Sequence, residues 1–526
     1  MAAANLIAGR GVGFRMNTAP PGFEAQRDLP RGFLEFFSNL HRRFTPWQQE
    51  LIAERRRVLE ESLEGNKPAH CFPSGAVRNG WRIELPDWCQ DQRNQVMVAA
   101  DDTELVVKML NCGAPGIILD LEDMMANEWE HHRVGIENIL ATLAGTLAYF
   151  DNKREQLTGI QPSPTVIWIR PRGLHLHQAG IVEDAITSAA LFDVARIAYQ
   201  IDPAELKHPL SFYIPKSESA EEALWWRDLF KAVAEAQGWS HSALKCMALV
   251  ESHPLAFQME EFLYNLRDHI LGLAVGRRDY MASLIHFNLY DPDWVLPDRN
   301  TIAHDVPFLK NLEDLMPEVC HKRGVLAIGS MTTCYPCRQD VEWNARALKV
   351  LAGEKRSDAD GLMDGARTGH PDQSQIALDQ FPYPNQLERR RAHGERYPDL
   401  RPRAQNLGQP TLAGTRAAVR AAIRYRNGLL NGLGASLLDG SIEDLASDRI
   451  YRLMIAQRMC HSRQVPVVDE AGNSVAHTRE RVRQLFDEEL ENLLAHAGRE
   501  LGTPETFRQA RRVSEAMIMS GEIDPL

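Results

Sequence analysis

The stretch ILGLAVGRRDYM, residues 270–281, passes abruptly from apolar residues and glycines to Arg277, Arg278 and Asp279. A short, almost continuous apolar run is typical of a strand that is buried on both faces, as strands of parallel sheets are. In parallel barrels the loops after the carboxyl ends of the strands build the active site. The three charged residues therefore mark a candidate functional edge of the protein.

Apolar runs of the same kind recur on both sides of this stretch. They are GIILDLED (116–123), TVIWIRPR (165–172), SFYIPKSES (211–219), KCMALVES (245–252), GVLAIGSM (324–331) and the weaker GLMDGA (361–366). Segments with helical periodicity, such as AEEALWWRDLFKAVAEAQG, separate most of them. Alternation of strand and helix predicts an α/β protein with a parallel sheet, closed or doubly wound, and this many repeats fit a (β/α)8 TIM-type barrel best.

Segments outside this alternation divide the chain into four expected parts. Residues 1–104 form an N-terminal helical clasp, with a helix that stops at Gly65, and a loop that leads into a barrel over residues 105–378. Residues 379–410 are rich in Pro, Arg and Gln, which predicts a linker or surface excursion. Residues 411–526 are helical in period and predict a separate α-helical domain.

Composition limits the partners of this 526-residue chain. Its formal charge of -12 argues against nucleic acid or an anionic membrane as the main partner. The sequence has no run of 18 apolar residues, no clear signal peptide and no disulfide framework among its eight cysteines. We expect a cytoplasmic protein, either a monomer or a small homo-oligomer, in which local basic groups bind any anionic substrate.

Charged residues gather at the predicted carboxyl ends of the strands. They are Asp120, Glu122, Asp123, Arg170, Arg172, Lys216, Glu218, Glu251, Arg277, Asp279 and Asp364. Several carboxylates on one rim would repel one another unless a cation lay among them, and oxygen ligands favour Mg²⁺. Glu251 and Asp279 end consecutive strands and are the best pair of ligands. The alternative is that both carboxylates cap loops or pair with arginines.

Arg170 follows the strand VIWI in the sequence WIRPRGLHL. Its guanidinium could face the same rim and stabilise an anion or a developing enolate oxygen. A structural ion pair with one of the rim carboxylates explains the same position equally well. The pattern alone leaves both interpretations open.

Motifs along nearly the whole chain carry a resemblance to a known family. They include LHRRF, LPDWCQDQRNQV, DLEDMMANEWEH, IRPRGLHL, IPKSESAEEALWWRDLF, VESHPLAFQMEEFLYNLRDHILGL, GRRDY, CHKRGVLAIGSM and IEDLASDRI. In this order and spacing they resemble the A-type malate synthases. The resemblance implies a Mg²⁺-dependent (β/α)8 barrel with an N-terminal helical clasp and a C-terminal helical plug. It also implies an acyltransferase that condenses acetyl-CoA with glyoxylate and hydrolyses malyl-CoA to malate and CoA.

The resemblance assigns roles to four residues of this chain. Glu251 and Asp279 match the two magnesium carboxylates, and Arg170 matches the arginine beside the enol oxygen. Asp444 of IEDLASDRI matches the aspartate that acts as general base. For this role, the C-terminal domain must lie over the mouth of the barrel and place Asp444 near the metal carboxylates.

Further residues follow from the same resemblance. Asp120 and Glu122 of DLED match acidic residues that line the pocket and hold the arginine in place. We expect the backbone amides of Gly276, Arg277 and Arg278 to hold the glyoxylate carboxylate, and the Arg277 side chain to support Asp279 by charge.

Several motifs depart from the usual pattern of that family. This chain has GRRDY for GRWDY, RPRGL for RPRGW, GSM for GGM, ARTGHP for a motif with Trp and Ala, and IEDLASD for MEDAATA. The departures indicate a divergent member whose acyl-CoA or 2-oxo acid could differ. Two other functions remain open: a malyl-CoA lyase-like reversible C–C lyase, and a degenerate barrel that acts as a binding protein.

Overall fold

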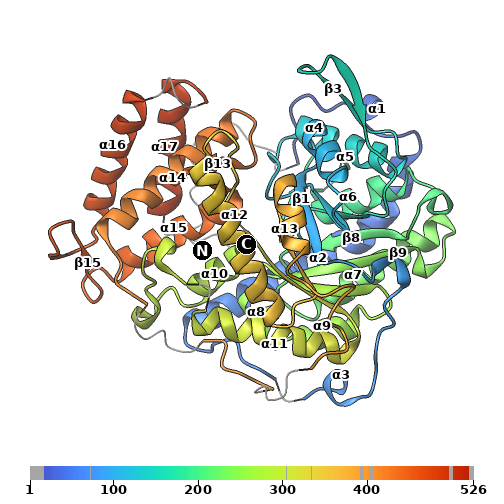
Figure 1. Ribbon diagram of the computed structural model, residues 1–526, viewed down its shortest axis with the longest axis horizontal. Helices are drawn as coiled ribbons and strands as arrows, with labels where there is room; N and C mark the ends of the chain where they lie inside the picture. The colour runs from blue at the N-terminus through green and yellow to red at the C-terminus, as the bar shows by residue number, and fades with distance from the viewer. Residues whose placement is uncertain are drawn as a thin grey trace.

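Eight parallel strands close into a barrel in the order β1-β12-β11-β10-β9-β8-β5-β2, which confirms the predicted fold class (Figure 1). The computed structural model describes residues 17–71, 73–183, 185–303, 305–332, 334–390, 396–401, 407–496 and 501–520. The strands are β1 Asn94–Ala99, β2 Gly116–Asp120, β5 Val166–Arg170, β8 Leu210–Ile214, β9 Leu244–Val250, β10 Ile270–Val275, β11 Leu326–Met331 and β12 Gly365–Thr368.

The barrel begins earlier in the chain than expected. Its first strand is β1, which lies before the predicted boundary at residue 105. The sequence NQVMVA does not form an apolar run, because it opens with two polar residues, Asn94 and Gln95, that are nevertheless buried. Asn94 donates a hydrogen bond to the Ser374 hydroxyl and accepts one from Thr368, so both polar ends of its side chain are satisfied inside the protein.

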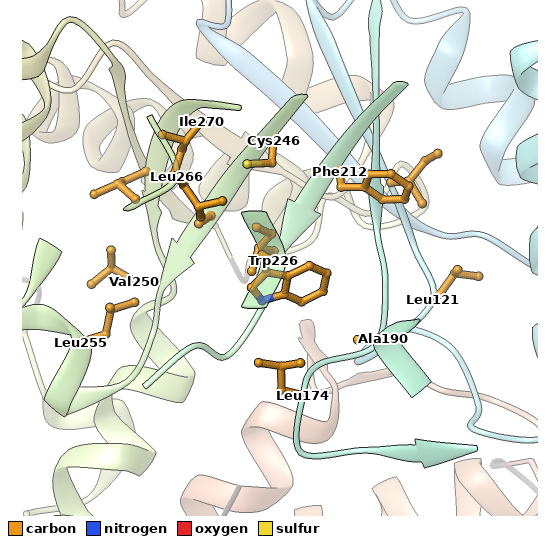
Figure 2. Close-up of a cluster of buried hydrophobic side chains, with 14 of the residues drawn as sticks. Leu121, Leu174, Ala190, Phe212, Trp226, Cys246, Val250, Leu255, Leu266 and Ile270 are labelled. Carbon is orange, nitrogen blue, oxygen red and sulfur yellow. The ribbon is translucent and has the colours of Figure 1, made fainter. Parts of the chain in front are cut away.

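Helices cover the outside of the barrel and apolar side chains fill the layer between. The helices are α4 Thr103–Leu110, α5 Trp129–Leu143, α6 Ala189–Ala198, α7 Glu222–Gln237, α8 His253–Ala256, α9 Met259–Asn265, α10 Arg277–Phe287, α11 Pro307–Arg323, α12 Val341–Asp360 and α13 Ser374–Leu378. Figure 2 shows part of this layer, where Trp226 of α7 lies among side chains such as Phe212 and Cys246. A second apolar cluster, with Trp168 and Tyr213, fills the barrel interior, so each strand is buried on both faces.

Small hairpins and 3-10 turns complete the barrel domain and its loops. The two-stranded pairs are β3 Ala148–Asp151 with β4 Gln156–Gly159, and β6 His177–Gln178 with β7 Thr187–Ser188.

Among the described residues, no helix is long and apolar enough to span a membrane.

The N-terminal clasp is built on one long helix, α2 Phe33–Leu63, which the short helices α1 Ala25–Asp28 and α3 Gly75–Arg78 precede and follow in the chain. Its buried apolar residues, among them Phe33, Phe37, Leu40 and Phe44, recur at three- and four-residue spacing and form one face. The helix ends just before Gly65, whose φ of +110 suits glycine, as the sequence predicts.

An ion pair buried in the protein joins this clasp to the barrel. Arg55 of α2 forms a two-pronged pair with Glu222 of α7, at 2.7 Å for each of two contacts. The same guanidinium donates a hydrogen bond to the backbone oxygen of Lys216, in the loop after β8. The clasp helix therefore holds a loop that, as described below, reaches the functional site.

We expect Arg55→Ala to lower the free energy of unfolding by about 3–5 kcal/mol, because it leaves the Glu222 carboxylate buried without a partner. Chemical denaturation followed by circular dichroism would measure the change. Arg57→Ala is the matched control, since Arg57 lies on the same helix and makes exposed ion pairs that contribute about 0–1 kcal/mol. Equal effects of the two variants would contradict the role given to the buried pair.

In the described residues, four helices form the C-terminal α-helical domain, beside the barrel in Figure 1. They are α14 Leu412–Leu430, α15 Leu445–Cys460, α16 Arg479–Ala495 and α17 Pro504–Met519, with the hairpins β13 Ser436–Leu438 and β14 Ser441–Glu443, and β15 Val467–Val468 and β16 Ser474–Val475. Helix α15 packs against α10 of the barrel domain. Arg458 of α15 pairs with Asp298 at 2.9 Å, which ties the two parts together.

The segment expected to be a linker, 379–410, packs on the barrel where it is described. Leu387 and Leu400 are buried, and the backbone amide of Gln386 donates a hydrogen bond to Asp364. Asp364 was expected among the rim charges, but it precedes β12 and so lies at the amino end of that strand. Its carboxylate also accepts the Ala327 amide, so it serves the structure and not the rim.

Candidate active site

A cavity of about 240 Å³ lies at the carboxyl ends of the barrel strands, and residues of the C-terminal domain also line it. We call it the barrel cavity. Its lining includes Arg170, Glu251, Gly276, Asp279, Arg367 and Asp444. The residues singled out as metal ligands, enolate-stabilising arginine and general base therefore meet in one cavity, although they come from distant parts of the sequence.

Arg170 ends β5 and is surrounded by carboxylates. It pairs with Glu122 at 2.6 Å, with Asp123 at shorter range, and lies 3.6 Å from Asp120, its register neighbour on β2. Burial alone would lower the pKa of Arg170, but Asp120, Asp123 and Glu122 outweigh it and raise the pKa well above its ordinary value. The guanidinium is thus a fixed cation on the wall of the cavity.

Asp120 and Glu122 hold this arginine and the loop around it. Asp120 accepts hydrogen bonds from the backbone amides of Glu122 and Met124, and burial raises its pKa to about 7. Glu122 accepts the backbone amide of Gly173, just after Arg170 in the chain. Both contact the arginine as expected, but it is Asp123 that lines the barrel cavity.

Glu251 and Asp279 are the two buried carboxylates at the ends of β9 and β10. Glu251 packs so closely on Gly276 that a Cβ there would lie 2.5 Å from a Glu251 carboxylate oxygen, so only glycine fits. Asp279 lies in the first turn of α10, and its Oδ1 has no hydrogen-bond partner in the described part of the chain. The nearest cations to this oxygen are Lys216 Nζ at 3.8 Å and Arg449 Nη1 at 3.9 Å.

The electrostatics of this pair test whether Mg²⁺ fits. Burial raises the pKa of Asp279 well above its ordinary value; Lys216 opposes this, while Glu251 and Asp123 raise the pKa further. A carboxylate so placed gains from an added divalent cation, and its unpartnered Oδ1 is a free ligand atom. Among the described residues, no group of three or more His, Cys, Asp or Glu side chains is placed to hold a metal ion. Two protein carboxylates suit Mg²⁺, which keeps several positions for water and substrate.

Asp444 caps the first turn of α15 and reaches the same cavity from the C-terminal domain. Its Oδ1 accepts the backbone amide of Ser447 at 3.2 Å. Its Oδ2 pairs with the Arg278 guanidinium at 3.1 Å. The side chain is therefore held at both oxygens, and one of them faces a residue of the barrel.

Comparison with known proteins assigns the chain to a family. Three family models match it: malate synthase, TIM barrel domain, over residues 166–406; malate synthase, C-terminal, over 409–525; and malate synthase, N-terminal domain, over 24–65. Malate synthase A of Escherichia coli (strain K12) is 30% identical over 517 residues, which cover 96% of this chain and 95% of that protein. The chain belongs to the malate synthase family.

Other members of the malate synthase family give similar matches. The malate synthase of Streptomyces clavuligerus is 35% identical over 464 residues, covering 84% of each chain. A solved structure of Haloferax volcanii malate synthase, a pyruvate/acetyl-CoA ternary complex, matches at 14% identity with a TM-score of 0.48, covering 71% of this chain and 92% of that one.

Arg278 stands where the family resemblance leads us to expect Trp, and its side chain has a defined place. Besides Asp444, it donates hydrogen bonds to the backbone oxygen of Ile442 and to the Ser447 hydroxyl, at 3.0 and 2.9 Å. It thereby connects the start of α10, in the barrel domain, to the start of α15. No local sequence pattern indicates this contact, because the two segments lie far apart in the chain.

Arg277 does not make the expected pair with Asp279 among the described interactions. Its guanidinium donates to the backbone oxygen of Ala303 at 3.2 Å. The backbone of residues 276–278 starts α10, where free amide groups and the helix dipole favour a bound anion. Binding of the glyoxylate carboxylate by these backbone amides stays a prediction, and their position at the start of a helix is compatible with it.

Lys216, which follows strand β8, joins the two groups of charged residues at the site. Its ammonium pairs with Asp123 at 2.6 Å and Glu122 at 3.2 Å, and its backbone amide donates to Glu251 at 2.8 Å. Its φ of +48 is unusual for a residue other than glycine, and such strain gathers at functional sites. Lys216 links the carboxylates around Arg170 to the Glu251 and Asp279 pair.

Proposed function

We propose that this chain is a malate synthase that condenses acetyl-CoA with glyoxylate and hydrolyses the resulting malyl-CoA to malate and CoA. The observation that carries the proposal is the meeting of Arg170, the Glu251 and Asp279 pair, and Asp444 in the barrel cavity. Membership of the malate synthase family supports the same reaction. In class the enzyme is an acyltransferase whose acyl group becomes part of a new carbon chain.

The first step is removal of a proton from the methyl group of acetyl-CoA. This group is a very weak carbon acid, so a base must act while the developing enolate oxygen is stabilised. Asp444 takes the proton, and Arg170 stabilises the oxygen, since its charge is fixed by the carboxylates around it. Ser447 keeps Asp444 in position by donating its backbone amide to Oδ1.

The second step is attack of the enolate carbon on the aldehyde carbon of glyoxylate. Glu251 and Asp279 would hold Mg²⁺, which when bound polarises the carbonyl group and orients the glyoxylate. The backbone amides of residues 276–278, at the start of α10, bind the glyoxylate carboxylate. Hydrolysis of the thioester then drives the reaction toward malate.

A thiol-release assay with acetyl-CoA tests the function. We expect free thiol to appear only when glyoxylate and Mg²⁺ are both present. Thiol release without glyoxylate would indicate a simple thioesterase, and accumulation of malyl-CoA without thiol would indicate a lyase. Either result would overturn the proposal.

Mg²⁺ should raise the melting temperature of the wild-type protein, because a ligand that binds the native state stabilises it by mass action. At 100 times the dissociation constant the gain is about 2.7 kcal/mol. Differential scanning fluorimetry with a potassium salt at equal ionic strength as control would measure it. Glu251→Gln should lose most of the shift, and an undiminished shift in that variant would remove Glu251 from the metal site.

A further inference from the structure

Arg367 places a guanidinium inside the barrel. It pairs in register with Gln95 of β1, and register neighbours point to the same face of a sheet. Gln95 points inward, since it contacts Tyr213 of β8 and Met247 of β9. Arg367 is 5% exposed and lines the barrel cavity.

No carboxylate of the described residues lies within ion-pair distance of Arg367. Its guanidinium donates one hydrogen bond, from Nη2 to the backbone oxygen of Val275, and its Nε has no partner. Burial lowers the pKa of Arg367, and although Tyr213 and Glu251 act against this, the pKa stays below its ordinary value. An arginine nevertheless keeps its charge in proteins.

Other buried arginines of the protein have a carboxylate. Arg55 pairs with Glu222, Arg172 with Asp193 and Arg323 with Glu260. Burying a cation without an anion is costly. A cation that faces a cavity in this state is well placed for an anionic group of a ligand.

The position of Arg367 indicates which ligand carries that anion. Its hydrogen bond goes to Val275, the residue directly before Gly276 and the turn proposed to bind the oxo acid. Arg278, another guanidinium beside this turn, is already held by Asp444. Glyoxylate has one carboxylate, which the turn and the metal site would use, and its aldehyde carbon carries only hydrogen. Bound glyoxylate would therefore offer no anionic group to Arg367.

We propose that the barrel cavity accepts, besides glyoxylate, a 2-oxo acid with a second carboxylate, and that Arg367 binds this second carboxylate. The proposal rests on the proposed condensation reaction. A methyl C–H bond of acetyl-CoA breaks and its proton goes to Asp444. The carbon then forms a bond to the 2-oxo carbon, whose oxygen takes up a proton as a hydroxyl group. Water cleaves the thioester, which releases a hydroxy-tricarboxylic acid and the CoA thiol.

The test compares kcat/KM for oxaloacetate, 2-oxoglutarate and glyoxylate, with 2-oxobutanoate and 2-oxopentanoate as acceptors lacking the second carboxylate. We expect wild-type protein to use one of the two dicarboxylic acids at least about 10-fold better than the monocarboxylic acid of the same chain length, as a charged hydrogen bond implies. In Arg367→Met the ratio of kcat/KM for that acid to kcat/KM for glyoxylate should fall about 10- to 100-fold. Methionine removes the charge and replaces the apolar stem of the arginine side chain, so the fold should persist.

Arg338→Met is the matched control, because Arg338 is 79% exposed and pairs with Asp372 outside the cavity lining. It should leave the ratio unchanged. Two results would overturn the inference and leave the proposed function standing. One is thiol release with glyoxylate but with no other acceptor; the other is a ratio of kcat/KM values that Arg367→Met does not change. A gain for malonyl-CoA over acetyl-CoA that depends on Arg367 would place the anion on the acyl group and overturn it too. No thiol release with any acceptor would overturn both.

Discussion

Asp279→Asn should lower kcat at least about 10²-fold, because it removes one of the two carboxylates proposed to hold Mg²⁺. Asparagine offers the metal a neutral oxygen in place of a charged one. The variant should still fold, since burial disfavours the charged form of the Asp279 acid and raises its pKa well above the ordinary value. Asparagine has nearly the shape of that acid.

Turnover measured over a Mg²⁺ titration would check this prediction, with circular dichroism to confirm the fold. Asp268→Asn is a suitable control, because its carboxylate is 53% exposed and pairs with Lys231 away from the cavity. It should change kcat by no more than about twofold. Wild-type turnover of Asp279→Asn at limiting Mg²⁺ would rule out Asp279 as a metal ligand.

Asp444→Asn should lower kcat by about 10²- to 10⁴-fold, the usual contribution of a general base. The amide oxygen can still accept the Ser447 backbone hydrogen bond, but the side chain can no longer take a proton. Glu251 and Asp279 are unchanged, so the Mg²⁺-dependent rise in melting temperature should remain. Exchange of the acetyl-CoA methyl protons with deuterated water measures the proton-transfer step alone and should fall with kcat.

This substitution also removes the carboxylate partner of Arg278, so a loss of activity could come from a shifted domain. A melting curve distinguishes the two causes. If the domains stay packed together, Asp444→Asn should keep the single-step melting curve of the wild type. Asp439→Asn serves as control, because Asp439 is 77% exposed in the same domain and pairs with Arg424, and asparagine tolerates its φ of +51. Methyl exchange at the wild-type rate in Asp444→Asn would exclude Asp444 as the base.

The barrel could be predicted from the sequence because most of its strands are buried on both faces and so appear as short apolar runs. The exception was β1, which carries the buried polar residues Asn94 and Gln95. Strand β12 was also placed a few residues early, since GART at 365–368 has little apolar character. Apolar patterns fail where a barrel interior holds hydrogen-bonded polar groups.

The site could be predicted only in part, for a related reason. Glu251 and Asp279 follow apolar strands, so their position at the rim could be predicted from the sequence. Asp444 caps a helix in another domain, and no local pattern marks such a residue; only the family resemblance pointed to it. The Arg278 contact with Asp444 depends on how the two domains pack. Such contacts need the tertiary structure.

The most direct measurement is product analysis with acetyl-CoA labelled by carbon-13 at both acetyl carbons, together with unlabelled glyoxylate and Mg²⁺. Nuclear magnetic resonance and mass spectrometry would follow the label. We expect free malate that carries both labelled carbons, in an amount equal to the thiol released. Labelled acetate with no new carbon–carbon bond, or labelled malyl-CoA with no free thiol, would contradict a synthase built from Arg170, the Glu251 and Asp279 pair, and Asp444.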